Sequence, residues 1–302
     1  MRGPLLLMSA ALAAGDARGP RTVVPDLTVD PGTTLPTSVN GVPGRLHIDP
    51  GAPAMPAVTA DLASRAGLKA GPFDVEWIVG PVSIGGRTAL GRIDLGRGPE
   101  LRRIAWWDRR WDPVADAVAG PGGVPAPVVR FRLRPPRPGE RAAALPMVGQ
   151  GGLEDRWAGL FALIELDGHP LRVQFNLNRP TTATASVGTA LARIHDGVAE
   201  GEPFPAVIEL GVERPVRTLR LVRPLMVGPL RVDRLLVRVA DHGNAAGLDT
   251  ARPSRDPDEV VVTGRRKRDR SKDHIILGRD QLERCSSIVF DKPAKQVRLS
   301  CL

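Results

Sequence analysis

Short runs in which apolar and polar residues alternate occur along much of the chain, and Gly, Pro or charged residues end them. Alternation over four to eight residues is typical of a strand with one buried face. Clear examples are residues 82–86, 206–210, 216–222 and 235–241. Helix signals occur over two short Ala-rich segments, 59–67 and 186–197, and the first begins with Thr and ends with Gly. Many short strands with few helices predict an all-β fold.

Two segments of this pattern recur at constant distances along the chain. Residues 39–53 and 166–180 share a Gly, a Pro, an Arg and a final Pro at an offset of 127. Residues 116–133 and 274–291 correspond in the same way at an offset of 158. The offsets differ by 31 residues, which predicts an insertion in the second half, at about residues 245–272. The chain is therefore expected to consist of two similar halves.

Composition sets the boundaries of these halves. The chain has 33 Gly and 30 Pro among 302 residues, and a Pro/Gly-rich stretch lies between the halves. We expect a first half at 22–135, a linker at 136–158 and a second half at 159–302. Hydrophobic residues make up 42% of the chain, which is enough to build a core and excludes a disordered protein.

The first residues have the pattern of a short secretory signal. Arg2 precedes an apolar run at 5–14 that contains the small residues of a cleavage site, so we expect residues 1–17 to be removed on export to the periplasm or the medium. No other run reaches the 18 apolar residues of a membrane helix, so no transmembrane anchor is expected in the mature chain.

Two cysteines occur, Cys285 and Cys301, and an even number in an exported chain favours a disulfide. Residues 291–295 read as the turn of a final hairpin, which places the two cysteines opposite each other on its strands. We therefore predict a bond between them.

Three segments together resemble the aspartic peptidases, the pepsin-like and retropepsin-like family. Residues 48–52, Ile-Asp-Pro-Gly-Ala, resemble the active-site loop of that family, and residues 62–68 resemble the helix that follows it. Residues 275–282 with 288–291 resemble the segment that closes a lobe. The resemblance implies two β-barrel-like lobes of the acid-protease type, with a cleft between them and one active-site loop in each.

The chemistry of that family requires one carboxylate from each lobe, and the two share a proton. Asp49 stands at the first position, and the repeat assigns the second position to Asn176, whose amide cannot hold or exchange that proton. The surrounding loop residues are Pro50, Gly51 and Ala52 in the first loop, and Leu177 and Asn178 in the second. Pro50, Leu177 and Asn178 depart from the family pattern, whereas Gly51 keeps the glycine of the tight turn.

Other candidate chemistry is weak. The five His residues are scattered without metal-ligand spacing, so neither a metal nor a cofactor is expected. Trp106, Trp107 and Trp111 form either a binding platform or packing between the lobes. Residues 265–272 are strongly basic, but expected export argues against a nucleic-acid partner. Residues 258–264 resemble a short segment of TonB-dependent receptors, and an edge strand is the alternative.

These observations favour a pseudopeptidase whose cleft binds extended peptide or protein segments in the bacterial envelope without cleaving them. One alternative is an active aspartic endopeptidase that uses Asp49, for example by pairing Asp49 of two copies in a dimer, as single-lobed retroviral peptidases do. The other alternative is a structural envelope protein without a cleft ligand. The sequence favours a protein without enzymatic activity, and it does not decide among these three functions.

Overall fold

A computed structural model describes residues 25–149, 159–241 and 273–302 of the chain. Within these ranges the protein is mostly β, with two sheets and three short helices, so the all-β prediction is confirmed. None of the helices is long and apolar enough to cross a membrane. The expected signal peptide, the segment 258–264 and the expected insertion at about 245–272 lie outside the described residues.

The first lobe is built on a seven-stranded sheet in the order β2-β3-β8-β4-β7-β6-β5. Val39 of β2 also pairs with Ile93 of β6, which closes the sheet on itself and leaves β5 as an added strand at its end. Helix α1 packs beside β4, and Thr59 caps it by accepting a hydrogen bond from the Leu62 N–H. The elements are β2 (Leu35–Val39), β3 (Val42–Ile48), β4 (Ala57–Thr59), α1 (Ala60–Arg65), β5 (Val75–Val79), β6 (Val82–Asp94), β7 (Pro99–Trp107) and β8 (Ala117–Ala119).

The second lobe repeats this plan within a twelve-stranded sheet, and helix α2 packs against its long hairpin. The order of its strands is β11-β12-β17-β13-β16-β15-β14, so β14 lies at the end as β5 does in the first lobe. The elements are β11 (Leu160–Leu166), β12 (His169–Phe175), β13 (Thr182–Ala183), α2 (Ala185–Ile194), β14 (Gly197–Glu209), β15 (Val212–Val227), β16 (Leu230–Arg238), β17 (His274–Leu277) and α3 (Arg279–Leu282).

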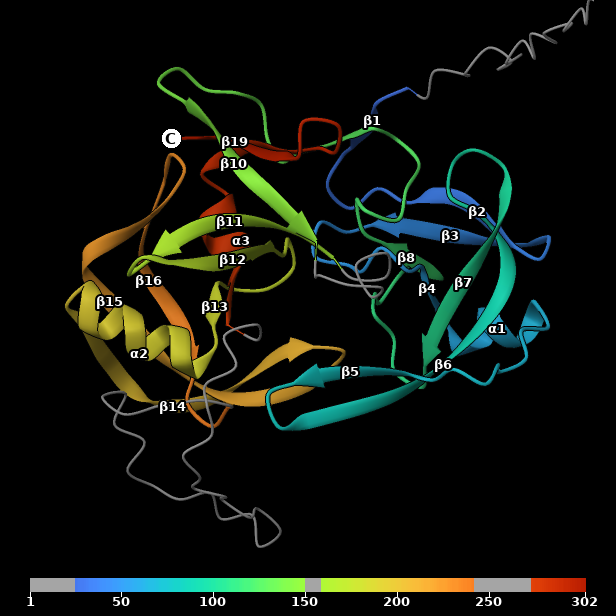
Figure 1. Cartoon of the computed structure of the whole chain (residues 1–302), viewed down its shortest axis with the longest axis horizontal. Helices are drawn as coiled ribbons and strands as arrows, with labels where there is room; N and C mark the ends of the chain where they lie inside the picture. The colour runs from blue at the N-terminus through green and yellow to red at the C-terminus, as the bar shows by residue number, and fades with distance from the viewer. Residues whose placement is uncertain (1–24, 150–158, 242–272) are drawn as a thin grey trace, which may run out of the picture.

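Five strands from both lobes form a joint between them at the top of the molecule in the view of Figure 1. Strand β9 of the first lobe pairs with β18 of the second, and β10 continues the sheet into β11. The segment expected as a linker therefore contains a nine-residue strand, because residues 141–146 pair with β19 and residues 147–149 pair with β11. The elements are β1 (Leu27–Val29), β9 (Val128–Arg132), β10 (Arg141–Gly149), β18 (Cys285–Asp291) and β19 (Gln296–Cys301).

The strand registers recur between the lobes at the two offsets found in the sequence. Ile48 of β3 lies beside Ala119 of β8, and Phe175 of β12 lies beside Leu277 of β17 in the same parallel arrangement. Those partners are separated by 127 and 158 residues between the lobes, as the sequence pattern requires. The two halves thus share the strand framework that positions the loops after β3 and β12.

One apolar core runs through both lobes and the joint. Its centre contains three fully buried phenylalanines, Phe131, Phe175 and Phe290, which lie edge to face. Phe131 comes from the first lobe and Phe175 from the second, and Phe290 contacts both. The two lobes therefore do not have separate cores.

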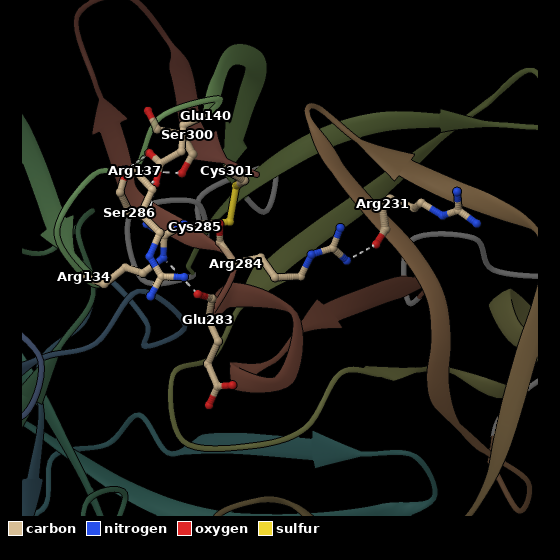
Figure 2. Close-up of a disulfide and its surroundings, with 10 residues drawn as sticks. All are labelled: Arg134, Arg137, Glu140, Arg231, Glu283, Arg284, Cys285, Ser286, Ser300 and Cys301. Atoms are coloured by element: carbon tan, nitrogen blue, oxygen red, sulfur yellow. Dashed lines mark hydrogen bonds and ion pairs between the residues drawn. A yellow bond between two sulfur atoms is a disulfide. The ribbon is translucent and has the colours of Figure 1, made fainter.

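The predicted disulfide joins Cys285 to Cys301 across the β18–β19 hairpin. The rest of the hairpin is shifted by one residue, and a bulge at Ser286 brings the two cysteines opposite each other. Figure 2 shows how Arg134 fixes this end of the hairpin: its guanidinium donates to the carbonyl oxygens of Glu283 (3.1 Å) and Arg284 (2.6 Å). The bond is thus held between segments of both lobes.

Candidate functional site

The loops that follow β3 and β12 hold the two positions expected to carry catalytic carboxylates. The backbone N–H of Asp49 donates to the Ala119 carbonyl oxygen at 3.1 Å, and that of Asn176 donates to the Leu277 carbonyl oxygen at 2.9 Å. Each side chain then caps its own loop in the same way. An oxygen of Asp49 accepts from the Gly51 N–H at 2.7 Å, and one of Asn176 accepts from the Asn178 N–H at 2.9 Å.

Asp and Asn form such turns readily, because their short side chains reach the backbone two residues on. The structure therefore places Asn176 at the position in the second lobe that Asp49 holds in the first. Two loops with the same local geometry present one carboxyl group and one amide.

The first loop is buried from Asp49 through Val58, and the Asp49 side chain is only 5% exposed. Burial raises the pKa of Asp49 above its usual value of 3.8, against the opposing effects of the Gly51 N–H and the nearby His47. The second loop is more accessible: Asn176 and Leu177 are partly exposed, and Asn178 is exposed. Of the two matched loops, the one that carries the carboxyl group is therefore the less exposed to solvent.

The first loop also packs tightly against the second lobe. A side chain at Gly51 would place its first carbon 2.5 Å from the Phe175 carbonyl oxygen, so only glycine fits there. The amide nitrogen of Gln174 donates to the Gly51 carbonyl oxygen at 2.7 Å. The close approach leaves the space beside Asp49 filled by β12 and its side chains.

A partly buried pair of His47 and Asp112 lies next to Asp49. His47 Nδ1 and an oxygen of Asp112 are 2.7 Å apart, and Asp112 also accepts from the N–H groups of Val114 and Ala115. The hydrogen bond to Asp112 raises the pKa of His47, while burial opposes this. Burial opposes ionisation of Asp112 too, but its hydrogen bonds from His47, Ala115 and Val114 lower its pKa to about 2.

Sequence reasoning missed Glu209, a second acidic residue near this site. One oxygen of Glu209 accepts from the Trp77 indole N–H at 2.9 Å, and the other lies 3.4 Å from the Gln174 amide nitrogen. Burial raises the pKa of Glu209, and the charge of Asp49 acts in the same direction. The residue lies at the end of β14, more than thirty residues after the loop that it approaches, and no motif surrounds it.

Two hairpins, β5–β6 and β14–β15, extend toward each other between the lobes (Figure 1). The tip of β5–β6 contains Gly80, where a side chain would collide with the buried carboxylate of Asp241 in the second lobe. Asp241 forms a buried ion pair with Arg238 at 2.9 Å. The tip of β14–β15 in turn enters the first lobe. We call this pair of reciprocal contacts the hairpin clasp.

The tryptophans lie where the clasp meets the first lobe. Trp77 contacts Trp107 and Trp111 edge to face, with ring centroids 6.4 and 4.8 Å away. Trp107 is buried in an apolar cluster that includes Leu210 of the second lobe, whereas Trp106 belongs to the main core. The packing interpretation of these tryptophans is thus the one that the contacts support. A cavity of about 10 Å³ beside Trp111 and Asp112 is close to the smallest that holds one water.

No group of three or more His, Cys, Asp and Glu side chains comes together as a metal site within residues 25–149, 159–241 and 273–302. No family model matches the sequence, and no curated protein matches it either. Among solved structures, the fold is similar to an aspartic proteinase from Irpex lacteus, with a TM-score of 0.40 and 11% sequence identity. That similarity covers 89% of this chain and 93% of the proteinase.

Proposed function

We propose that this chain is a peptidase-like protein that binds extended peptide or protein segments in the bacterial envelope without cleaving them. The observation that carries the proposal is the pair of matched loops, in which Asn176 makes the hydrogen bond that Asp49 makes in the other lobe. An aspartic mechanism needs a base for the attacking water and an acid for the substrate carbonyl. An amide at one position can supply neither.

The surroundings of Asp49 support the same conclusion. Its carboxyl group is nearly inaccessible, and Gly51 beside it is in contact with β12. A dimer that paired Asp49 of two copies would have to displace the second lobe of each. This argues against the alternative in which two copies form one active site.

The ends of the two sheets suggest how a segment would bind. Strands β5 and β14 are the last strands in their sheets, and exposed apolar side chains occur on both: Ile78 is 50% exposed on β5, and Phe204 is 43% exposed on β14. An edge strand with apolar residues invites pairing with another strand. An extended peptide added to such an edge gains backbone hydrogen bonds and covers these side chains.

Location in the envelope is part of the proposal. The disulfide between Cys285 and Cys301 fits an oxidising compartment such as the periplasm, where such bonds persist. The secretory pattern of the first residues points to the same place, although those residues lie outside the described part of the chain.

The test is to incubate the purified mature protein with an immobilised library of random extended peptides, and to assay cleavage of the same peptides between pH 3 and 7. We expect binding without turnover. Turnover that pepstatin blocks and that Asp49→Ala abolishes would overturn the proposal and establish an active peptidase. Absence of both binding and turnover would favour the structural alternative.

Glu209 favours a second candidate, in which acid chemistry is retained with a different partner. Its charge interacts with that of Asp49, and it comes from the second lobe as the missing carboxylate should. Both of its oxygens already face donors, Trp77 and Gln174. If the pair is catalytic, Glu209→Gln and Asp49→Asn will each abolish a measured turnover, whereas Asn176→Ala will not.

A further inference from the structure

Three two-residue turns of this chain have the same left-handed backbone. They connect β2 to β3 at Asn40-Gly41, β11 to β12 at Asp167-Gly168, and β14 to β15 at Leu210-Gly211. The first residue of each has a positive φ, of 47°, 56° and 48° respectively. Asn and Asp tolerate this conformation better than other side chains, and it is disfavoured for a bulky residue such as Leu. The third turn thus departs from the rule that the other two follow.

The side chain of Leu210 explains the departure. It is 3% exposed and belongs to an apolar cluster with Met55, Ala57, Ala105 and Trp107, all of the first lobe. The partly buried residues packed against this cluster, Val75, Trp77, Ile84 and Trp111, also come from the first lobe. Among the residues described for this cluster, Leu210 alone comes from the second lobe. It therefore fills a pocket that the first lobe builds.

Polar contacts hold the tip in the manner of a bound peptide. Arg109 donates to the Leu210 carbonyl oxygen at 3.4 Å, and Trp77 donates to the carboxylate of Glu209. The tip thus supplies an acidic residue followed by an apolar one.

We propose that this pocket is a binding site for a leucine-like side chain of an extended peptide, and that Leu210 occupies it as an internal competitor. The inference rests on the proposed peptide-binding function and deepens it by naming one determinant of the ligand: an apolar residue preceded by an acidic one. The positive φ of this turn favours Asn over Leu. The presence of Leu210 is therefore explained by its apolar contacts in the pocket and not by the turn. Binding of a peptide displaces the hairpin tip and opens the clasp.

The test variant is Leu210→Asn, which gives this turn the residue of the β2–β3 turn and empties the pocket. Leu210→Ala is a second variant, which empties the pocket without adding a polar group. Val222→Asn is the matched control, because Val222 lies on β15 of the same hairpin and is 56% exposed. The probes are acetyl-Ala-Ala-Glu-Leu-Ala-Ala-amide and the same peptide with Asn in place of Leu. Binding to the full mature chain is measured by calorimetry and by tryptophan fluorescence.

We expect the Leu peptide to bind Leu210→Asn or Leu210→Ala at least about tenfold more tightly than the unaltered protein, because removal of a competitor raises the fraction of binding-competent molecules. The Asn peptide and the Val222→Asn control should show no such gain. Equal affinity in folded Leu210 variants, or an equal gain in Val222→Asn, would overturn the inference. If the unaltered protein binds the random library but no variant gains affinity, only this inference fails. If neither the unaltered protein nor either Leu210 variant binds anything in the library, the proposed function fails with it.

Discussion

At the scale of single residues, Asp49 has a carboxyl group whose ionisation is disfavoured by its surroundings. Because burial raises its pKa, the folded state holds its proton more tightly than the unfolded chain does, so ionised Asp49 lowers stability above its folded pKa. Asn176 shows that an amide supports the same turn. We expect Asp49→Asn to raise the free energy of unfolding at pH 7 by about 1 kcal/mol or more, or roughly 2 °C in Tm.

The gain should shrink as the pH falls and vanish below about 3.8, where the carboxyl group is protonated in both states. Urea unfolding of the two proteins between pH 3 and 7 measures it. The reverse change, Asn176→Asp, is the control, and at this partly exposed position it should have little effect. The positive charges of His47 and Arg179 lower the pKa of Asp49 and so oppose the effect of burial. A loss of stability in Asp49→Asn at pH 7 would show that these two charges outweigh burial.

Ionisation of the His47–Asp112 pair has the opposite effect on stability from ionisation of Asp49: it stabilises the folded protein. A carboxylate whose pKa is about 2 when folded stabilises the protein above its unfolded pKa, and this contribution is lost as the pH falls from about 4 to 2. The raised pKa of His47 adds stability that is complete below about 6.5 and lost as the pH rises through the folded value. We expect Asp112→Asn to cost about 2 kcal/mol near pH 5, and almost nothing near pH 2.

Thermal unfolding across this range, with NMR titration of His47, checks the prediction. The pKa of His47 should fall in the variant. An unchanged His47 titration would show that Asp112 does not govern it.

At the scale of elements, the disulfide closes the last hairpin. A bond between residues 16 apart removes entropy mainly from the unfolded chain, and the chain-entropy model gives about 3 kcal/mol for such a loop. We therefore expect Cys285→Ala with Cys301→Ala to lower the free energy of unfolding by about that amount. Urea unfolding with and without reductant measures the effect, and alkylation with mass spectrometry of the native protein should find no free thiol.

The hairpin clasp depends on Gly80 in two ways. Its φ is +60°, and a side chain there would lie 2.0 Å from the Asp241 carboxylate. Gly168 is a matched control, because its φ is +70° and no atom lies within 4 Å of an added carbon. Gly168→Ala should cost about 1 kcal/mol from backbone strain alone. We expect Gly80→Ala to cost at least about 1 kcal/mol more, as overpacking does, measured by urea unfolding. Equal costs would show that the tip of β5–β6 does not press on the second lobe.

Elements with local signals could be predicted from the sequence, and those defined by distant contacts could not. Asn40-Gly41 and Asp167-Gly168 mark their turns through backbone preference alone, so β3, β12 and the loops after them follow. The third turn could not be predicted from its sequence, because Leu210 is stabilised there by an apolar cluster of the other lobe and not by backbone preference. The place of Glu209 at the site could not be predicted for the same reason, because its neighbours Trp77 and Gln174 are distant in sequence. Strand β10 is expected as part of a linker because its sequence has no regular alternation of apolar and polar residues, and its pairing with β19 is a distant contact.

At the scale of the whole molecule, the joint makes the lobes interdependent. Strand β9 of the first lobe pairs with β18, and the core is continuous through Phe131 and Phe290. We expect residues 22–135 expressed alone to lack fixed tertiary structure. In this fragment β9 loses its pairing with β18, and the core loses the apolar residues that the second lobe supplies. Near-UV circular dichroism of the fragment tests this, and co-expression with residues 136–302 should restore the native signal. A fragment that unfolds cooperatively on its own would contradict the prediction.

The pairing of β9 with β18 also sets the order in which the protein can be completed. A chain that is synthesised or exported from its N-terminal end presents β9 well before β18 and β19, which follow more than 150 residues later. Until they arrive, the first lobe has an open strand edge and an unfinished core, both of which favour association with other chains. A chain truncated before the last hairpin would therefore keep the open edge of β9 and an unfinished core for as long as it exists.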